Sequence, residues 1–391
     1  MQLTYQAPGD MAALWVWKVA HGHGHTVIRR EGRRVMHLGL MMECDYRQDR
    51  TQREAFDEAF ALAETAETEG YDGVWFAERH FAPPGGTGPI PSVASAPVVW
   101  ATAIAARTSR LRVGTAVLVL PLGHPVRMAE EIATLDNISQ GRVDLGIGRS
   151  SFPRSYDGYD IPYAESRDRF EEFLQVMRLA FTQERFSYTG KYYTFRDVCL
   201  IPKPYQQPHP PLRAAATTRE TFAVMGRLGL PIFAGVGSAV MSDVAQVLQD
   251  YRTAWHEAGH AGDGDVVLRL PIYVANTMER ALAEPKDSTM HHYNRLRQAL
   301  QRSAGATDSD ARTTRAERLA TLTYDDVVRE RVVFGTPEDV AKRLQILRES
   351  LGLSGFIMES NVGGRILPEY VLQSIRLFGQ EVAPRLRASA D

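Results

Sequence analysis

The stretch that decides the fold of this chain is residues 113–149, VGTAVLVLPLGHPVRMAEEIATLDNISQGRVDLGIGR. It begins with a continuous apolar run rich in β-branched residues, which is typical of a parallel strand buried on both faces. Apolar residues then recur at helical spacing after Pro125, which suits a first helical turn, and Gly141 marks the helix end. A second short strand follows at residues 143–147. This βαβ unit predicts a parallel sheet with its functional side chains at the carboxyl ends of the strands.

The same alternation of strand and helix continues along most of the chain. Strands are expected near residues 37–42, 73–77, 112–118, 143–147, 212–215, 231–235, 267–274 and 354–359. Helices are expected near residues 53–69, 94–107, 125–138, 165–183, 219–228, 240–259, 337–350 and 368–383. Eight strands, each followed by a helix, predict an α/β fold of the (β/α)8 TIM-barrel class with insertions. An open doubly wound sheet is the alternative, but no GxGxxG motif follows any strand.

We expect residues 36–391 to form a single barrel domain. Residues 1–35 lack a clear signal-peptide pattern, and we expect them to be a disordered N-terminal extension. Within the domain, the segment FSYTGKYYTF (186–195) predicts a short hairpin. Residues 283–326 are polar and weakly periodic, which favours a mobile lid over the barrel mouth, with His291 and His292 as solvated loop residues.

Composition excludes several classes of protein. The chain has 391 residues, of which 44% are hydrophobic and 24% charged, and a formal net charge of −2. Near-neutral charge gives no support for a nucleic-acid or anionic-membrane partner. Cys44 and Cys199 are too few for a disulfide framework and have no metal-site spacing, and no apolar run is long enough to span a bilayer. We therefore expect a cytoplasmic enzyme without a metal ion.

Three positions near strand ends carry residues suited to chemistry. Arg149 directly follows the fourth strand, where a guanidinium can hold a phosphate through two charge-assisted hydrogen bonds. Thr217 and Thr218 follow the fifth strand and open a helix, whose free N–H groups form an anion site. Either threonine can instead be a simple helix N-cap. His80, at the end of the second strand, can act as a general acid or base near neutral pH.

Taken together, these stretches resemble the bacterial luciferase-like flavin monooxygenases, the alkanal monooxygenase-like group. The resemblance rests on residues 113–149, EGYDGVWFAERHF (69–81), GTPEDVAKRL (335–344) and VGGRILPEY (362–370), in matching order. It implies a luciferase-like TIM barrel with a mobile active-site loop in the region of residues 283–326.

The resemblance also implies site residues. Thr218 and Thr221 match positions that bind the flavin phosphate in that family. Ala116 and Val117 match a pair joined by a cis peptide bond, which lets backbone groups meet the flavin ring. His80 matches the second of two adjacent histidines in luciferase. Two departures make light emission doubtful, since Arg79 replaces the catalytic first histidine and Gly148 replaces a reactive cysteine.

The resemblance implies a flavin-dependent monooxygenase that uses reduced FMN and O2 to oxidise a small organic substrate. A separate NAD(P)H-dependent flavin reductase would supply the reduced flavin, and a homodimer is the expected assembly. Two alternatives stay open at this point: a deazaflavin-dependent hydride-transfer oxidoreductase of the same fold, and a non-catalytic flavin-binding partner subunit. A metal-dependent hydrolase is disfavoured because the strand ends offer no His/Asp/Glu ligand set.

Overall fold

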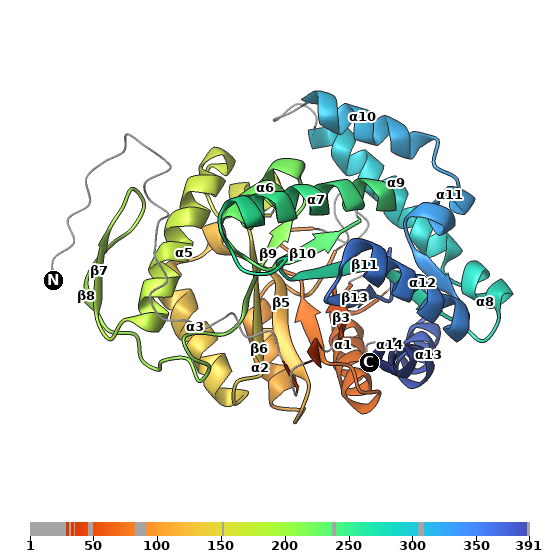
Figure 1. Ribbon diagram of the computed structural model, residues 1–391, viewed down its shortest axis with the longest axis horizontal. Helices are drawn as coiled ribbons and strands as arrows, with labels where there is room; N and C mark the ends of the chain where they lie inside the picture. Colours follow the sequence, from red (N-terminus) through yellow and green to blue (C-terminus); the bar gives the residue numbers. More distant parts are fainter. Residues whose placement is uncertain are drawn as a thin grey trace.

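Eight parallel strands close into a barrel in the computed structural model (Figure 1). The structure describes residues 29–30, 33–34, 36–45, 50–82, 91–150, 152–236, 240–303 and 309–388. In order around the barrel the strands are β3 (His37–Met42), β4 (Gly73–Phe76), β5 (Arg112–Val119), β6 (Val143–Gly148), β9 (Leu212–Ala216), β10 (Ile232–Gly235), β11 (Val266–Val274) and β13 (Gly355–Glu359). β10 pairs with β11 and β13 with β3, so the barrel is closed. The predicted (β/α)8 fold is confirmed.

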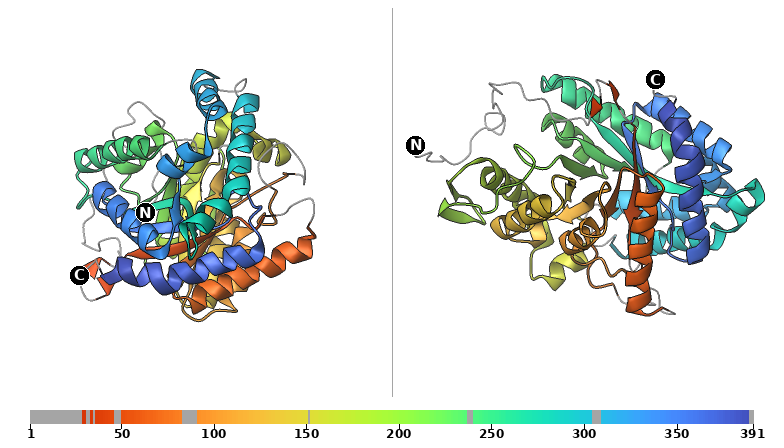
Figure 2. Two further views of the ribbon diagram at one scale, coloured as in Figure 1. Left: turned by 90° about the vertical axis from the view of Figure 1, so that its right-hand side faces the viewer. Right: turned by 90° about the horizontal axis from the view of Figure 1, so that it is seen from below.

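Helices cover the outside of the barrel at the expected places. They are α1 (Gln52–Thr68), α2 (Pro97–Ala105), α3 (Pro125–Ile138), α5 (Ser166–Thr182), α6 (Arg219–Arg227), α7 (Met241–Glu257), α12 (Pro337–Leu351) and α13 (Pro368–Leu377). A π-helical turn (Phe378–Val382) and α14 (Ala383–Ala388) continue α13. The first and last barrel helices, α1 and α13, lie side by side (Figure 2). No helix in the described ranges is both long and apolar enough to cross a membrane.

The local sequence explains where helices begin. Thr51 and Glu54 form a reciprocal capping box at the start of α1, so each satisfies a backbone N–H of the other. Pro125 is the first residue of α3, as predicted, and the preceding His124 accepts a hydrogen bond from the Arg127 N–H (3.3 Å). Gly141, with φ of +82°, follows the helix in a conformation that favours glycine.

The barrel interior is filled around Trp75. This side chain is fully buried, and it packs where Gly39, Gly73 and Gly114 carry no side chain. A Cβ on Gly39 would lie 2.1 Å from the indole ring, so the glycines make room for the tryptophan. Trp75 belongs to an apolar cluster together with Met41, Ala77, Phe233, Val267 and Ile357, and Ala116 and Val117 pack partly buried against this cluster.

Several elements elaborate the barrel. β7 (Phe186–Thr189) and β8 (Thr194–Val198) pair antiparallel, which confirms the predicted hairpin. A short strand that we did not predict, β12 (Val333–Gly335), extends the sheet beside the upper end of β11. After β6 the chain forms the short helix α4 (Pro153–Gly158) and a 3-10 turn (Tyr163–Glu165) before α5.

The segment expected to be a lid is largely helical. It contains α9 (Lys286–Ser303), α10 (Ser309–Ala320) and α11 (Tyr324–Glu330), preceded by α8 (Met278–Ala283). The start of α9 is fixed to the chain after β13, because the Ser288 hydroxyl donates to the Val362 carbonyl (2.7 Å) and accepts from the Arg365 N–H (2.9 Å). His291 and His292 lie on α9 and are both partly buried, so the expectation that they are solvated loop residues is wrong.

Most of the proposed N-terminal extension, residues 1–28, lies outside the described residues. Of the remainder, β1 (Arg29–Arg30) and β2 (Arg33–Arg34) form a two-residue antiparallel pair.

Candidate active site

The carboxyl ends of the barrel strands surround a mouth whose floor is apolar. Ala116 and Val117 from β5 lie on this floor, and the peptide bond between them is cis. The pairing of β5 with β6 is interrupted between Thr115 and Leu118, so the backbone around Ala116 and Val117 leaves the regular ladder. An apolar floor with an irregular strand segment exposes backbone groups to a flat ligand above them.

Gly148 lies next to this floor at the end of β6. A Cβ at this position would approach the Val117 Cγ2 atom to 2.5 Å, and the Ala215 Cβ to 3.6 Å. Val117 therefore fills the space beside Gly148, the position where luciferase carries a cysteine. A side chain at this position would fit only if Val117 moved.

Arg149 stands beside Gly148 on the same rim. Its Nη1 atom is 3.4 Å from the Ser166 hydroxyl, a long hydrogen bond, and within the described ranges its guanidinium forms no ion pair. The buried Tyr156 donates a hydrogen bond from its hydroxyl to the Arg149 carbonyl, which fixes the backbone at this point. The result is a half-buried cation whose charge is available to a ligand.

The N-terminus of α6 opens on the same rim. β6 and β9 are neighbours, with Ile147 opposite Ala214, so the residues that follow the two strands emerge together. Thr217 and Thr218 are exposed there. The Thr218 hydroxyl caps α6 by accepting the Thr221 N–H (3.3 Å), and the two hydroxyl oxygens are 2.8 Å apart. The capping role of Thr218 is confirmed.

The charges around this rim suit an anion. Glu220 in the first turn of α6 pairs with Arg167 (2.7 Å), and nearby charges including that of Arg149 help to keep its pKa low. A guanidinium, hydroxyls and free helix N–H groups together form the donor set that a phosphate needs. The residues predicted for a flavin phosphate, Arg149, Thr217, Thr218 and Thr221, therefore lie together, and their donor set fits that group.

His80 lies in the segment that directly follows β4. Its Nε2 atom is 2.8 Å from Glu78 Oε1, and the second Glu78 oxygen accepts the Val119 N–H at 2.7 Å. The Tyr159 hydroxyl is 3.4 Å from His80 Nδ1. Glu78 therefore pairs with His80, whereas Arg79 pairs with Glu43 and Arg127 with Glu131 (2.9 Å).

A four-residue ionic cluster, which the sequence did not reveal, borders the mouth between β3, β4, β11 and β13. Arg79 holds Glu43 through two hydrogen bonds (2.9 and 2.8 Å), and Arg269 links Glu43 (2.5 Å) to Glu359 (3.1 Å). Burial alone would raise the pKa of Glu43, but the charges of Arg79 and Arg269 outweigh it and lower the pKa to about 2. Arg79 occupies the position of the luciferase histidine, and its guanidinium is paired with Glu43 in this cluster.

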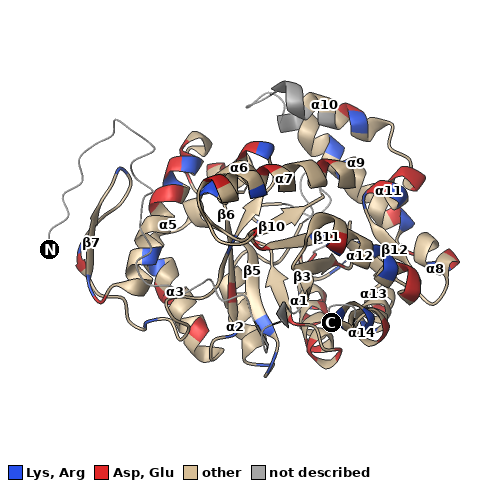
Figure 3. Cartoon of the chain, in the orientation of Figure 1, with Lys and Arg blue, Asp and Glu red and all other residues tan. Residues whose placement is uncertain are grey.

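One signal for this cluster was present in the sequence. Glu43 and Glu359 stand at strand ends, and Arg269 is a charged residue inside an apolar strand. Most other charged residues lie on the surrounding helices, and the strands are mostly uncharged (Figure 3). A charge at such a position in a barrel strand points into the mouth or the floor.

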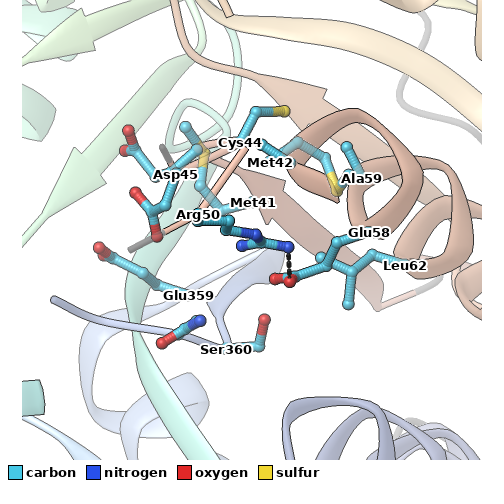
Figure 4. Close-up of a pocket in the computed structure, with 13 residues that line it drawn as sticks. Met41, Met42, Cys44, Asp45, Arg50, Glu58, Ala59, Leu62, Glu359 and Ser360 are labelled. Carbon is cyan, nitrogen blue, oxygen red and sulfur yellow. Dashed lines mark hydrogen bonds and ion pairs between the residues drawn. The ribbon is translucent and has the colours of Figure 1, made fainter. Parts of the chain in front are cut away.

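A small pocket lies beside the cluster and is separate from the phosphate rim. It has a volume of about 30 Å³ and is bordered by the end of β3, by α1 and by the segment after β13, with Arg50 paired to Glu58 across it (Figure 4). That volume accommodates roughly two water molecules. Across the described ranges, no group of three or more His, Cys, Asp or Glu side chains is placed to hold a metal ion.

The fold defines a TIM-barrel protein, and Arg149 and the N-terminus of α6 lie together at the carboxyl ends of β6 and β9. The chain belongs to the luciferase-like monooxygenase family, whose model matches residues 36–354.

Two curated relatives illustrate the range of similarity. The 4-hydroxyprotoasukamycin monooxygenase of Streptomyces nodosus subsp. asukaensis is 28% identical over 337 residues, which cover 84% of this chain and 86% of that protein. The uncharacterized protein y4wF of Sinorhizobium fredii is 35% identical over 166 residues, 42% of this chain, and the match spans about half (46%) of its length.

Solved structures agree with the fold. Monooxygenase RslO1 from Streptomyces bottropensis has a TM-score of 0.72 and 26% identity, covering 89% of this chain and 99% of that one. The oxygenating constituent of 3,6-diketocamphane monooxygenase from Pseudomonas putida, solved with FMN, has a TM-score of 0.75 at 21% identity, covering 90% and 98%. An F420-dependent secondary alcohol dehydrogenase has a TM-score of 0.66 at 18% identity, covering 90% and 99%. Relatives with FMN and relatives with F420, a deazaflavin, thus share this barrel.

Proposed function

We propose that this protein is the oxygenase component of a flavin-dependent monooxygenase, which uses reduced FMN and O2 to oxidise a small organic substrate. The observation that carries the proposal is the position of Arg149 next to the N-terminus of α6, on the rim of an apolar floor that holds Ala116 and Val117. A set of phosphate-binding donors beside an apolar, irregular strand suits a cofactor that has a phosphate group and a flat ring.

Each residue set has its own task. Arg149, Thr217, Thr218 and Thr221 hold the phosphate through charge-assisted and neutral hydrogen bonds. Ala116 and Val117 support the ring, and the apolar floor beneath them excludes water. The flavin, when bound in its reduced form, supplies the electrons for dioxygen. His80 moves a proton near the reacting atoms.

The proposal includes partners. We infer that a separate NAD(P)H-dependent flavin reductase delivers the reduced FMN, since no GxGxxG motif follows a barrel strand. We infer also that two copies of the chain form a homodimer, and that the helical segment 283–326 is a lid whose position changes when the site is filled.

An anaerobic titration with reduced FMN, riboflavin and oxidised F420 in parallel tests the proposal. We expect reduced FMN to bind more tightly than riboflavin, because only FMN carries the phosphate. After oxygen is admitted, the bound flavin should reoxidise at a rate distinct from that of free reduced FMN.

Binding of F420 without FMN would replace the proposal by hydride transfer. FMN binding with reoxidation like that of the free cofactor would favour a non-catalytic partner subunit.

A further inference from the structure

The side chain of His80 is shielded from the mouth by other residues. It is only 4% exposed, because the rings of Phe81 and Tyr159 lie against the imidazole at centroid distances of 5.6 and 5.1 Å. Tyr159, directly after α4, is itself 45% exposed. The phenol of Tyr159 thus covers one side of the imidazole and is itself open to solvent.

Glu78 contacts one of the two ring nitrogens of His80. Its Oε1 atom lies 2.8 Å from Nε2, a geometry in which the imidazole Nε2–H donates to the carboxyl oxygen. Glu78 is 7% exposed, and its other oxygen is held by the Val119 N–H, two residues beyond the Ala116–Val117 peptide. Nδ1 is left facing the Tyr159 hydroxyl at 3.4 Å. The carboxylate thus orients the imidazole and ties it to the strand that forms the floor.

The segment that carries Tyr159 is held close to His80 by two further contacts. Tyr156, one helical turn earlier, is anchored through its hydroxyl to the Arg149 carbonyl. Gly158 lets Phe81 pack closely, since a Cβ there would lie 2.2 Å from the phenyl ring. Partial burial, and then the charge of Glu78, raise the pKa of the Tyr159 phenol, so it retains its proton at neutral pH.

We propose that Glu78, His80 and Tyr159 form a proton relay in which Tyr159 is the catalytic acid, an inference that rests on the proposed function above. Tyr159 gives its phenol proton to the oxygen atom that is being reduced, and a proton passed on by His80, whose Nδ1 faces the phenol oxygen, replaces it. Glu78 holds the Nε2–H throughout and is a positioning residue. Solvent is the final source of the proton.

The electrons and protons of this step balance with reduced FMN and dioxygen as the reactants. Without an organic substrate, anionic reduced FMN, dioxygen and one proton give oxidised FMN and hydrogen peroxide. Two electrons pass from the flavin to dioxygen, and the relay contributes the one proton that the flavin does not supply.

The kinetic test compares Tyr159→Phe with Tyr163→Phe, which removes a hydroxyl from the same insertion without touching His80. Each protein is loaded anaerobically with reduced FMN and mixed with oxygenated buffer, and flavin absorbance is followed. We expect Tyr159→Phe to slow reoxidation by about 10²-fold and to lose the solvent deuterium isotope effect, with unchanged affinity for FMN. Tyr163→Phe should react like the unmodified protein. Reoxidation of Tyr159→Phe at the unmodified rate and isotope effect would overturn the relay.

The second readout does not depend on a cofactor. Nitrogen-15 NMR of the FMN-free protein, with His80→Gln to assign the signal, should show His80 protonated on Nε2, and Glu78→Gln should remove that preference. Protonation of His80 on Nδ1 alone in the unmodified protein would overturn the relay. Failure of the unmodified protein to bind FMN would instead overturn the proposed function, so the two failures are distinguishable.

Discussion

The two ends of the barrel use charged residues in different ways. At the amino ends of the strands, buried or half-buried charges pair within the fold, Arg112 with Asp144 and Arg213 with Asp265. His37 lies beside Asp144, and burial lowers the pKa of its imidazole. Arg213 and Asp265 are 2.7 Å apart, and the Ser354 hydroxyl also donates to Asp265. Burial alone would raise the pKa of Asp265, but Arg213 and Ser354 lower it.

At the carboxyl ends, charge is partly exposed and unevenly paired. The ionic cluster of Glu43, Arg79, Arg269 and Glu359 is satisfied internally, whereas Arg149 forms no ion pair among the residues that the structure describes. The amino end therefore serves stability, and we propose that the Arg149 cation at the carboxyl end serves a ligand. TIM barrels in general carry their functional residues at the carboxyl ends of the strands and stabilising residues at the amino ends.

The largest expected effect is on stability at the amino end. Asp265→Ala leaves Arg213 buried without its carboxylate, and we expect it to lower the free energy of unfolding by about 3 kcal/mol. Urea denaturation measures the loss. Asp57→Ala, which breaks the exposed Arg53–Asp57 pair, should have little effect on stability, because solvent screens that pair. Equal losses of unfolding free energy in the two variants would show that the pair at the amino end of the barrel stabilises the fold no more than an exposed pair does.

At the carboxyl end, Arg149→Ala should act on binding and leave stability nearly unchanged. Loss of a charge-assisted grip of about 2–3 kcal/mol corresponds to roughly 30- to 150-fold weaker FMN binding. Riboflavin, which lacks the phosphate, should bind both proteins equally, and calorimetric titration measures both ligands. Arg127→Ala, at an exposed arginine that starts α3, is the matched control. Parallel weakening of riboflavin and FMN would contradict the phosphate assignment.

The ionic cluster at the mouth predicts a pH dependence. The pKa of Glu43 is lowered from 4.5 to about 2 in the folded protein, so its stabilisation is present above pH 4.5 and is lost as the pH falls towards 2. Glu43→Gln should therefore cost about 2 kcal/mol at pH 7 and progressively less below pH 4.5. Melting temperatures of both proteins across this range provide the comparison. A constant difference at every pH would show that the charge of Glu43 is not what stabilises the cluster.

The smallest effect separates capping from binding. Thr218→Ala and Thr336→Ala each remove an N-cap hydroxyl, from α6 and α12, and each should cost about 1 kcal/mol of stability. Only Thr218→Ala should also weaken FMN binding, by about fivefold. If FMN affinity responds equally to both, Thr218 is a cap alone.

The sequence determined the order of the barrel elements and the position of the residues that we propose for the phosphate. Strand and helix periodicities are local, and a parallel barrel brings the residues after β6 and β9 to one edge, so Arg149 and Thr218 could be placed together from their positions alone. The pairing of Glu78 with His80 was also within reach, because residues two apart in an extended segment point the same way, whereas Arg79 points to the other side.

Only the tertiary structure decided the contacts across the mouth. Arg269 meets Glu43 across 226 positions of sequence, and Tyr159 reaches His80 across 79. Such contacts depend on how long insertions pack onto the barrel, which no local periodicity encodes. The helices α9, α10 and α11 were missed because α9 and α10 are much more polar than the barrel helices, and α9 is fixed partly by contacts such as that of Ser288 with the chain after β13.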